Sequence, residues 1–242
     1  MDIRQLVLVS KERDPAVNDL CNLFDLEVAF NDPEIIHFGL ENALLPVGRT
    51  FIEVISPIQE GTTAERFINR RKGDGGYMVI IQVDNFSESK NIVDKENISV
   101  VWESKYAEAQ AIHLHPKQMG GAILSLDSMD PPSSWKWAGE DWEKCINIET
   151  ATSIKGVQIQ SKNPQEMCKK WKAILGKNNS GNKITLDNTW IEFIYDEDGR
   201  GDGIYSFDIQ VKDKLKVKER AKDLGFLMDN KIKVGGVIFT LS

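Results

Sequence analysis

The sequence predicts an α+β protein made of tandem β-α-β-β-β modules arranged in two similar halves. One observation is an internal repeat, in which TFIEVI (50–55) and GDGGYMVIIQVDN (73–85) return as TWIEFI (189–194) and GDGIYSFDIQVKD (201–213). A third matching pair closes each copy, GGAILSLD (120–127) and GGVIFTLS (235–242). Three matches in one order indicate a duplication. The length of 242 residues has room for two domains of ordinary size.

In the first half, the sequence predicts two successive modules, each with the order strand, helix and three strands. IRQLVLVS (3–10) is typical of a strand, and Asp14-Pro15 is typical of a helix start, with Val17, Leu20, Cys21 and Phe24 at helical spacing. Thr62 with Glu65 predicts a capping box on a connecting helix. The expected strands lie near 27–30, 35–40, 50–56, 76–83, 98–103, 108–115 and 121–127, with a helix near 86–94.

The second half repeats this order with shorter loops. We expect a strand over 154–160 and a helix after Asn163-Pro164, then strands to 196, a strand over 203–211, a helix over 213–223 and strands to 241. Four modules fit the chain. The predicted domains are therefore residues 1–127 and 151–242, joined by a linker over 128–150.

That linker combines structure-breaking prolines with unusual aromatic content. Pro131-Pro132 interrupt regular structure, and Trp135, Trp137 and Trp142 follow within a short stretch. A free linker rarely carries so much aromatic surface, so we expect the segment to pack against the domains. Two interpretations remain open: a clamp that fixes the domains together, or a lid that closes a pocket.

Composition excludes several classes of function. The chain has 30 Lys and Arg against 37 Asp and Glu, a formal charge of −7, without a long basic stripe, which disfavours nucleic acid and anionic membranes as partners. It shows no secretory leader and no apolar run of membrane-spanning length, and its three cysteines are widely spaced. We expect a cytoplasmic protein with reduced thiols and a small-molecule ligand, either a monomer with paired domains or a homodimer.

The segments 51–85 and 113–127 resemble the vicinal oxygen chelate superfamily, which includes glyoxalase I, methylmalonyl-CoA epimerase, extradiol dioxygenases and bleomycin-resistance proteins. The resemblance is weaker over the second half. It implies two glyoxalase-like domains, each with a curved mixed sheet around a cleft. It also implies that the first domain is the functional one, since the second has little chemistry left at matching positions and is expected to be a scaffold.

In that superfamily four side chains converge on a divalent metal. The resemblance puts Gln5, Glu53, Met78 and Ser125 at these positions in the first half, and Gly156, Glu192, Ser206 and Thr240 in the second. A thioether and a hydroxyl are poor ligands for the metals concerned. We therefore expect no metal and no other cofactor, with a divalent ion as the disfavoured alternative. A rebuilt site using His37, His113 and His115 is a further alternative.

Glu53 is the residue on which the remaining chemistry depends. Strand alternation puts Phe51, Glu53 and Ile55 on one face, where apolar neighbours raise the pKa of a carboxyl towards that of a general base. Gln5, Ser125 or His115 would then donate to a developing oxyanion. Residues expected to bind substrate are Phe51, Tyr77, Met78, Ile80, Ser125, Trp135 and Trp137.

Tyr77 leaves a choice, because alternation points it away from Met78 unless a bulge near Gly75-Gly76 turns it inward. Two functions also stay open. One is a metal-independent isomerase or lyase acting on a small oxygenated organic molecule in the first-domain cleft. The other is a non-catalytic small-molecule binding or resistance protein of the bleomycin-resistance type.

Overall fold

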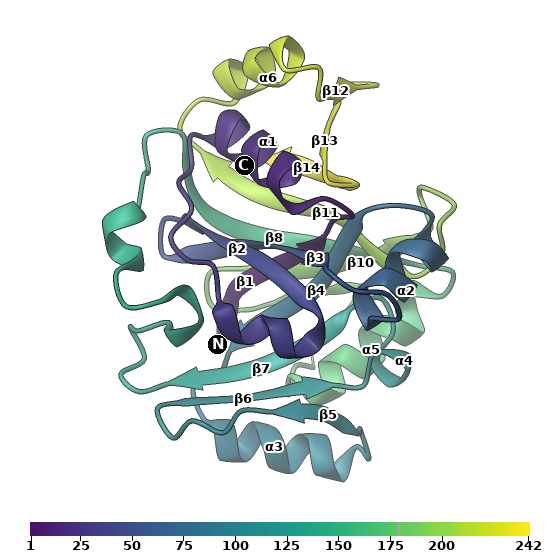
Figure 1. Ribbon diagram of the computed structural model, residues 1–242. Helices are drawn as coiled ribbons and strands as arrows, with labels where there is room; N and C mark the ends of the chain where they lie inside the picture. The colour runs from purple at the N-terminus through teal and green to yellow at the C-terminus, as the bar shows by residue number, and fades with distance from the viewer. Residues whose placement is uncertain (179) are drawn as a thin grey trace.

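The computed structural model describes residues 1–178 and 180–242. Figure 1 shows mixed strands at the centre of the molecule, α6 at the top, α3 at the bottom, and the linker running along one side. The first half contains β1 (Asp2–Val9), α1 (Arg13–Phe24), η1 (Pro33–Phe38), β2 (Leu40–Val47), β3 (Thr50–Pro57), α2 (Thr63–Arg71), β4 (Gly75–Gln82), α3 (Phe86–Lys95), β5 (Val100–Glu103), β6 (Ala109–Leu114), α4 (Pro116–Met119) and β7 (Ile123–Met129).

The linker carries two short 3-10 turns, η2 (Lys136–Ala138) and η3 (Trp142–Cys145). The second half contains β8 (Ala151–Ser161), α5 (Pro164–Ile174), β9 (Lys183–Thr185), β10 (Trp190–Tyr195), β11 (Gly203–Val211), α6 (Lys214–Asp223), β12 (Leu227–Met228), β13 (Lys231–Val234) and β14 (Val237–Leu241). No helix in the described part of the chain is long and apolar enough to cross a membrane.

Strand pairing confirms the modular architecture. The first-half order is β2-β3-β1-β4-β7-β6-β5, and the second-half order is β9-β10-β8-β11-β14-β13-β12. In each module the first strand runs parallel to the last, and the two modules of a half meet through an antiparallel pair, β1 with β4 or β8 with β11. The third module is reduced, since between α5 and β10 the described residues form only the short strand β9.

Three local expectations are wrong. The segment predicted as a strand over 35–40 is mostly the 3-10 helix η1, because the Asp32 side chain accepts from the Glu34 backbone N–H and Pro33 starts a helical turn. The segment near 27–30 contributes one isolated bridge, from Phe30 to Leu44. Helix α1 begins at Arg13, ahead of the predicted Asp14 cap.

The Thr62 cap on α2 is confirmed, because its hydroxyl accepts from the Glu65 N–H.

Two apolar clusters organise the packing. The larger one joins both halves and takes in the buried sides of α1, α3, α5 and α6, with α1 packed on α6 and α3 on α5. The smaller one belongs to the first half, and lies between the sheet, α2 and the linker. We call the sheet face that carries Gln5, Glu53, Ile80 and Ser125 the linker-covered face.

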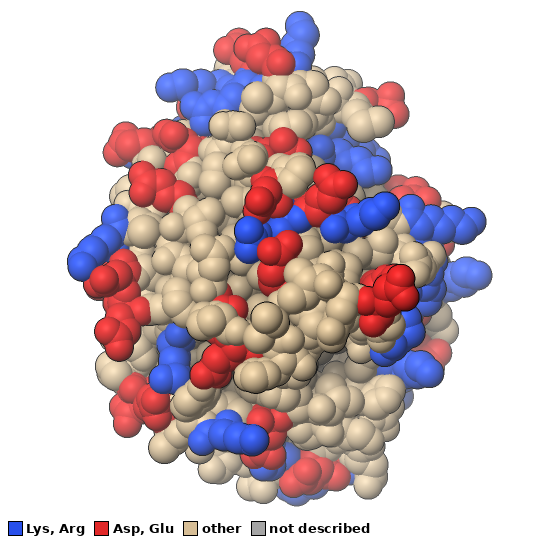
Figure 2. Space-filling view, in the orientation of Figure 1, with Lys and Arg blue, Asp and Glu red and all other residues tan. Residues whose placement is uncertain are grey.

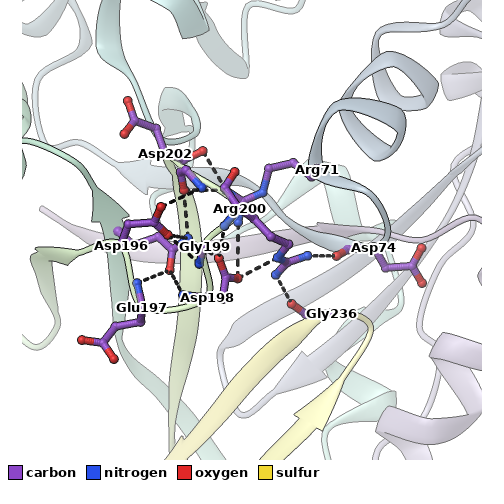
Figure 3. A network of polar contacts seen from close by, with 11 residues as sticks. Arg71, Asp74, Asp196, Glu197, Asp198, Gly199, Arg200, Asp202 and Gly236 are labelled. Carbon is purple, nitrogen blue, oxygen red and sulfur yellow. Dashed lines mark hydrogen bonds and ion pairs between the residues drawn. The ribbon is translucent and has the colours of Figure 1, made fainter.

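A charged joint also connects the halves (Figure 3). Arg71, at the end of α2, is 2% exposed and donates through Nη1 to the carbonyls of Arg200, Gly201 and Asp202, at 3.1, 2.7 and 2.9 Å. Arg200 reaches back and donates to the Asp74 and Gly236 carbonyls, at 2.8 and 2.9 Å. The carboxylate of Asp198 lies between the two guanidinium groups. The loop over 196–202 is therefore folded around a cation supplied by the other half.

The outer surface carries charges of both signs. On the face in Figure 2, acidic and basic side chains are interspersed, with uncharged surface between them. This distribution agrees with the absence of a long basic stripe in the sequence.

Candidate functional site

Two bulges in the β1–β4 ladder shape the linker-covered face. The register slips between Ile3 and Gln5, and again opposite Tyr77, where Val7 pairs with Met78 and Leu8 pairs with Gly76. Tyr77 is therefore the extra residue of a bulge, and it packs edge-on against Phe67 in the same cluster as Met78, with ring centroids 5.1 Å apart. Of the two choices left by the sequence, the inward-turned Tyr77 is the one observed. Burial raises the pKa of Tyr77 to about 12, so its hydroxyl stays protonated at neutral pH.

Glu53 lies in the middle of this face and is buried. The Gln5 Nε2 donates to its Oε2, and the Asn42 Nδ2 donates to its Oε1, each at 2.7 Å. Both donors are held in place by second bonds. The Trp135 Nε1 donates to the Gln5 Oε1 at 2.7 Å, and the Asp32 backbone N–H donates to the Asn42 Oδ1 at 2.8 Å. The two amides consequently present N–H groups, and not carbonyls, to the carboxylate.

Desolvation and hydrogen bonding shift the pKa of this carboxyl in opposite directions. Burial raises the pKa of Glu53 to about 7, against the lowering effect of the bonds from Asn42 and Gln5. A carboxyl with such a pKa exists in both protonation states near neutral pH. It can therefore take up a proton and give it back, which is the requirement for general acid–base chemistry.

The linker tryptophans close this face from outside. Trp135 and Trp142 are 1% and 4% exposed, which confirms that the linker packs down. Trp135 stacks on Phe51 with ring centroids 6.1 Å apart, and Trp142 meets the edge of Phe51 at 4.9 Å. The linker therefore fills the cleft that we expected over this face. Without the linker, Phe51, Met78 and Ile80 would form a large exposed apolar patch.

A second buried carboxylate lies on β7. Asp127 accepts from the hydroxyl of Ser125, and through Oδ2 from the Trp137 Nε1 at 2.7 Å. Burial raises the pKa of Asp127 to about 7, against the lowering effect of those two bonds. The sequence did offer a signal for it, since strand alternation puts Asp127 on the same face as the predicted Ser125. Each of two linker indoles therefore belongs to a hydrogen-bonded group that contains a buried acid.

The histidines lie away from Glu53. His115 caps the short helix α4, where its Nδ1 accepts from the Lys117 N–H, and it has no hydrogen bond to Glu53 or Gln5. His37 lies on η1 and not on a strand as expected. His113 packs against Trp102 with the rings tilted and their centroids 4.4 Å apart, and burial lowers its pKa to about 4, which keeps it neutral.

The four residues at the metal positions implied by the resemblance, Gln5, Glu53, Met78 and Ser125, do not fit a divalent ion. Both oxygens of Glu53 accept from amide nitrogens, and the only oxygen of Gln5 accepts from Trp135. Met78 offers a thioether, and the hydroxyl of Ser125 donates to Asp127. Across residues 1–178 and 180–242, no group of three or more His, Cys, Asp or Glu side chains could hold a metal. Oxygen and imidazole donors free to coordinate are what such ions need.

The second half keeps only part of this arrangement. The Gln158 Nε2 donates to Glu192 at 2.8 Å, and Ser206 donates to the Gln158 carbonyl at 2.7 Å. At the position equivalent to Gln5, a Cβ on Gly156 would lie 2.2 Å from the Trp190 ring, so this indole occupies the space of the missing side chain. A Gln and Glu pair is present here, but its Gln158 stands at the position equivalent to Val7, and a Ser206 hydroxyl takes the place of the tryptophan donor.

Sequence comparison finds distant relatives among epimerases. Mitochondrial methylmalonyl-CoA epimerase from Mus musculus is 27% identical over 92 residues, which is 37% of this chain and 52% of the epimerase. The human enzyme is 26% identical over the same length. The chain thus spans about half the length of the curated relatives that it matches. No family model matches the sequence.

Structural comparison covers nearly the whole chain. A variant of 4-hydroxymandelate synthase from Streptomyces coelicolor superimposes with a TM-score of 0.70 and 13% identity, covering 93% of this chain and 75% of the synthase. A hypothetical protein from Staphylococcus aureus gives a TM-score of 0.66 and 12% identity, covering 99% and 98%. At these identities the likeness establishes the fold, which consists of paired glyoxalase-like domains.

Proposed function

Since the chain is a member of the vicinal oxygen chelate superfamily, with the fold of its two-domain proteins, we propose that its first domain acts on a small oxygenated organic molecule by proton transfer at Glu53. The observation that carries the proposal is the buried carboxyl of Glu53, held between two amide donors, with its pKa raised to about 7. The reaction class is isomerase or lyase chemistry that begins with removal of a proton next to a carbonyl.

In this mechanism Glu53 takes the proton, and Gln5 and Asn42 keep the carboxyl in one orientation. When Glu53 becomes neutral, the amide N–H groups nearby are free to stabilise negative charge that develops on a substrate oxygen. Phe51, Met78 and Ile80 would exclude water from the reacting atoms. Ser125 would contribute only if its bond to Asp127 rearranged, and His115, which caps α4, has no hydrogen bond to Glu53 or Gln5.

Substrate can reach Glu53 only if the linker moves. Trp135 and Trp142 cover Phe51, and Trp135 bonds to the amide that holds Glu53. We therefore assign the linker the role of a lid, and the described arrangement is its closed state. A lid of this kind would sequester the reaction from bulk water and would open for product release.

The alternative is a non-catalytic binding protein of the bleomycin-resistance type. It is favoured by the aromatic lining, in which Phe51 and the linker tryptophans could enclose an apolar ligand without any reaction. Both functions use the same face, so they differ in whether Glu53 exchanges a proton with the ligand.

Proton exchange separates the two functions directly. The wild-type protein is incubated with methylmalonyl-CoA in D₂O, and loss of the substrate α-proton is followed by NMR. Exchange that is abolished in Glu53→Gln, while the affinity for the substrate is kept, supports the catalytic proposal. Glu192→Gln is the matched control, because this carboxylate has the corresponding position and a Gln partner in the other half. Binding without exchange in the wild type favours the binding protein, and equal exchange in Glu53→Gln would contradict a role for Glu53.

A further inference from the structure

A hollow of about 500 Å³ lies between the two halves, outside the linker-covered face. Its wall on the first half includes Arg4, Arg49 and Gln82, and its wall on the second half includes Ser153, Lys155 and Asn188. The linker borders it at Pro132. The hollow is thus built by all three segments of the chain.

Two of the three cationic side chains in this hollow make no direct ion pair with a described residue. Arg4 belongs to the bulge at the start of β1, and its Nε is buried without a hydrogen-bond acceptor. Within the part of the chain that the structure describes, neither Arg4 nor Lys155 forms an ion pair. Arg49 pairs with Glu143 at 2.7 Å on the exposed side. A buried guanidinium nitrogen left unbonded is costly unless a ligand or water supplies an acceptor.

The two arginines converge on one neutral atom. The Nη2 of Arg4 and the Nη2 of Arg49 both donate to the carbonyl of Ser133, at 3.4 and 3.2 Å. Burial, and after it repulsion from Arg49, lowers the pKa of Arg4 to about 10, so Arg4 remains charged at neutral pH. Paired guanidinium groups that point at a single oxygen form a fork suited to the several oxygens of an anion.

The aromatic rings fix the orientation of Arg4. Its Cζ lies 5.6, 5.4 and 5.8 Å from the ring centroids of Phe51, Trp135 and Trp142. These rings surround the guanidinium carbon at cation–π distance, and the Nη2 group still donates to the Ser133 carbonyl. The guanidinium is therefore positioned before any ligand arrives, which favours binding.

The carboxylates on the same walls are already bonded. Asp84 and Asp187 accept from the amino-terminal nitrogen of Met1, at 2.9 and 2.6 Å. Asp2 accepts from the Asn188 and Thr189 backbone N–H groups, at 2.7 and 3.1 Å. None of the three neutralises Arg4 or Lys155 by a direct contact.

We infer that the hollow between the halves binds a small oxyanion, a phosphate or carboxylate group, held by Arg4 and Arg49 from the first half and by Lys155 from the second. This site is separate from Glu53 and does not depend on the function proposed there. Because Ser133 and the rings of Trp135 and Trp142 belong to the linker, the bound anion would also fasten the linker and the second half together.

The test uses the full chain with inorganic phosphate and with malonate as probes, at constant ionic strength set by chloride. Isothermal titration calorimetry and thermal unfolding are measured for the wild type and for Arg4→Met, Arg49→Met and Lys155→Met. We expect saturable binding that raises Tm, and an affinity at least about tenfold weaker when either Arg4 or Arg49 is replaced. Arg70→Met is the matched control, because this exposed guanidinium also lies over a ring, 5.4 Å from the Phe67 centroid, but outside the hollow.

The two probes separate the sources of the oxyanion. Binding of phosphate alone identifies a phosphorylated ligand, binding of malonate alone identifies a carboxylic acid, and binding of both supports a general oxyanion site. Should Arg4→Met fail to fold by circular dichroism, Arg49→Met and Lys155→Met carry the comparison. The inference is overturned if neither probe binds, or if all variants, including Arg70→Met, respond to the probes as the wild type does.

Discussion

Replacement of Arg71 by methionine tests the joint between the halves. Methionine preserves much of the apolar stem but removes the cation from three carbonyls and from the neighbourhood of Asp198, at a position 2% exposed. Breaking a buried charged network by removing one partner costs about 3–5 kcal/mol. Hydrogen bonds to charged groups contribute roughly 1.5–3 kcal/mol each, so three separate bonds would sum to more, but they share one nitrogen and are not additive.

The expected effect is large compared with the whole stability of a protein of this kind, which is about 5–15 kcal/mol. For a chain of this size each kcal/mol corresponds to roughly 2–4 °C, so Tm should fall by roughly 6–20 °C. The assay is urea and thermal unfolding, followed by circular dichroism. Because the joint connects the halves, we also expect the single transition to broaden or to separate into two.

Two companion variants make this test specific. Arg71→Lys keeps the charge without the planar fork, and should recover only part of the loss. Arg70→Met removes the exposed neighbouring guanidinium and should leave Tm nearly unchanged. A loss below about 1 kcal/mol in Arg71→Met would exclude a stabilising role for this guanidinium, because it would mean that the carbonyls of the loop over 196–202 find other donors without cost.

Two further predictions concern the linker-covered face. Burial raises the pKa of Glu53 and of Asp127 from 4.5 and 3.8 to about 7, so each acid contributes stability that is complete below about pH 4 and is lost as the pH rises through 7. The urea concentration at the unfolding midpoint of the wild type should therefore decrease as the pH is raised from 5 to 8, relative to that of the double variant Glu53→Gln, Asp127→Asn. Parallel pH profiles of the two proteins would exclude these acids as the cause. Trp135→Phe keeps the stacking on Phe51 but leaves the Gln5 oxygen without its donor, which should cost about 1–3 kcal/mol and speed amide hydrogen exchange over 133–146. Unchanged amide hydrogen exchange over 133–146, with Trp102→Phe as control, would show that the hydrogen bond from Trp135 to Gln5 does not hold the linker in place.

The internal repeat predicted the modules well because each module is a local unit. The strand, helix and hairpin signals of one module lie within roughly 40–55 residues of one another, and the two copies report the same pattern independently. The exception is the segment PEIIHF, where apolar Ile35 and Ile36 resemble a strand. A side-chain bond from Asp32 and a left-handed Gly39 fix a 3-10 helix there instead, and leave Ile36 59% exposed. Such short runs carry too little periodicity to separate the two structures.

The candidate site was only partly accessible from sequence. Alternation along FIEVI placed Glu53 among apolar neighbours, and the structure confirms that it is buried. Its partners were harder to find, because Trp135 reaches Gln5 from 130 residues away and Asn42 lies on β2, where no strand was predicted beyond residue 40. His115 looked suitable by residue type alone, but the Pro116 that follows it starts a helix, and the ring is used as a cap. Long-range hydrogen bonds of this kind have no local signature.

Titration of Glu53 itself shows whether a base of near-neutral pKa lies beneath the linker. Difference infrared spectroscopy of the wild type against Glu53→Gln isolates the carboxyl band of this residue as the pH is changed. We expect a midpoint near 7 for that band. A midpoint near the ordinary value of 4.5 would contradict it, because Glu53 would then be a permanently ionised structural carboxylate.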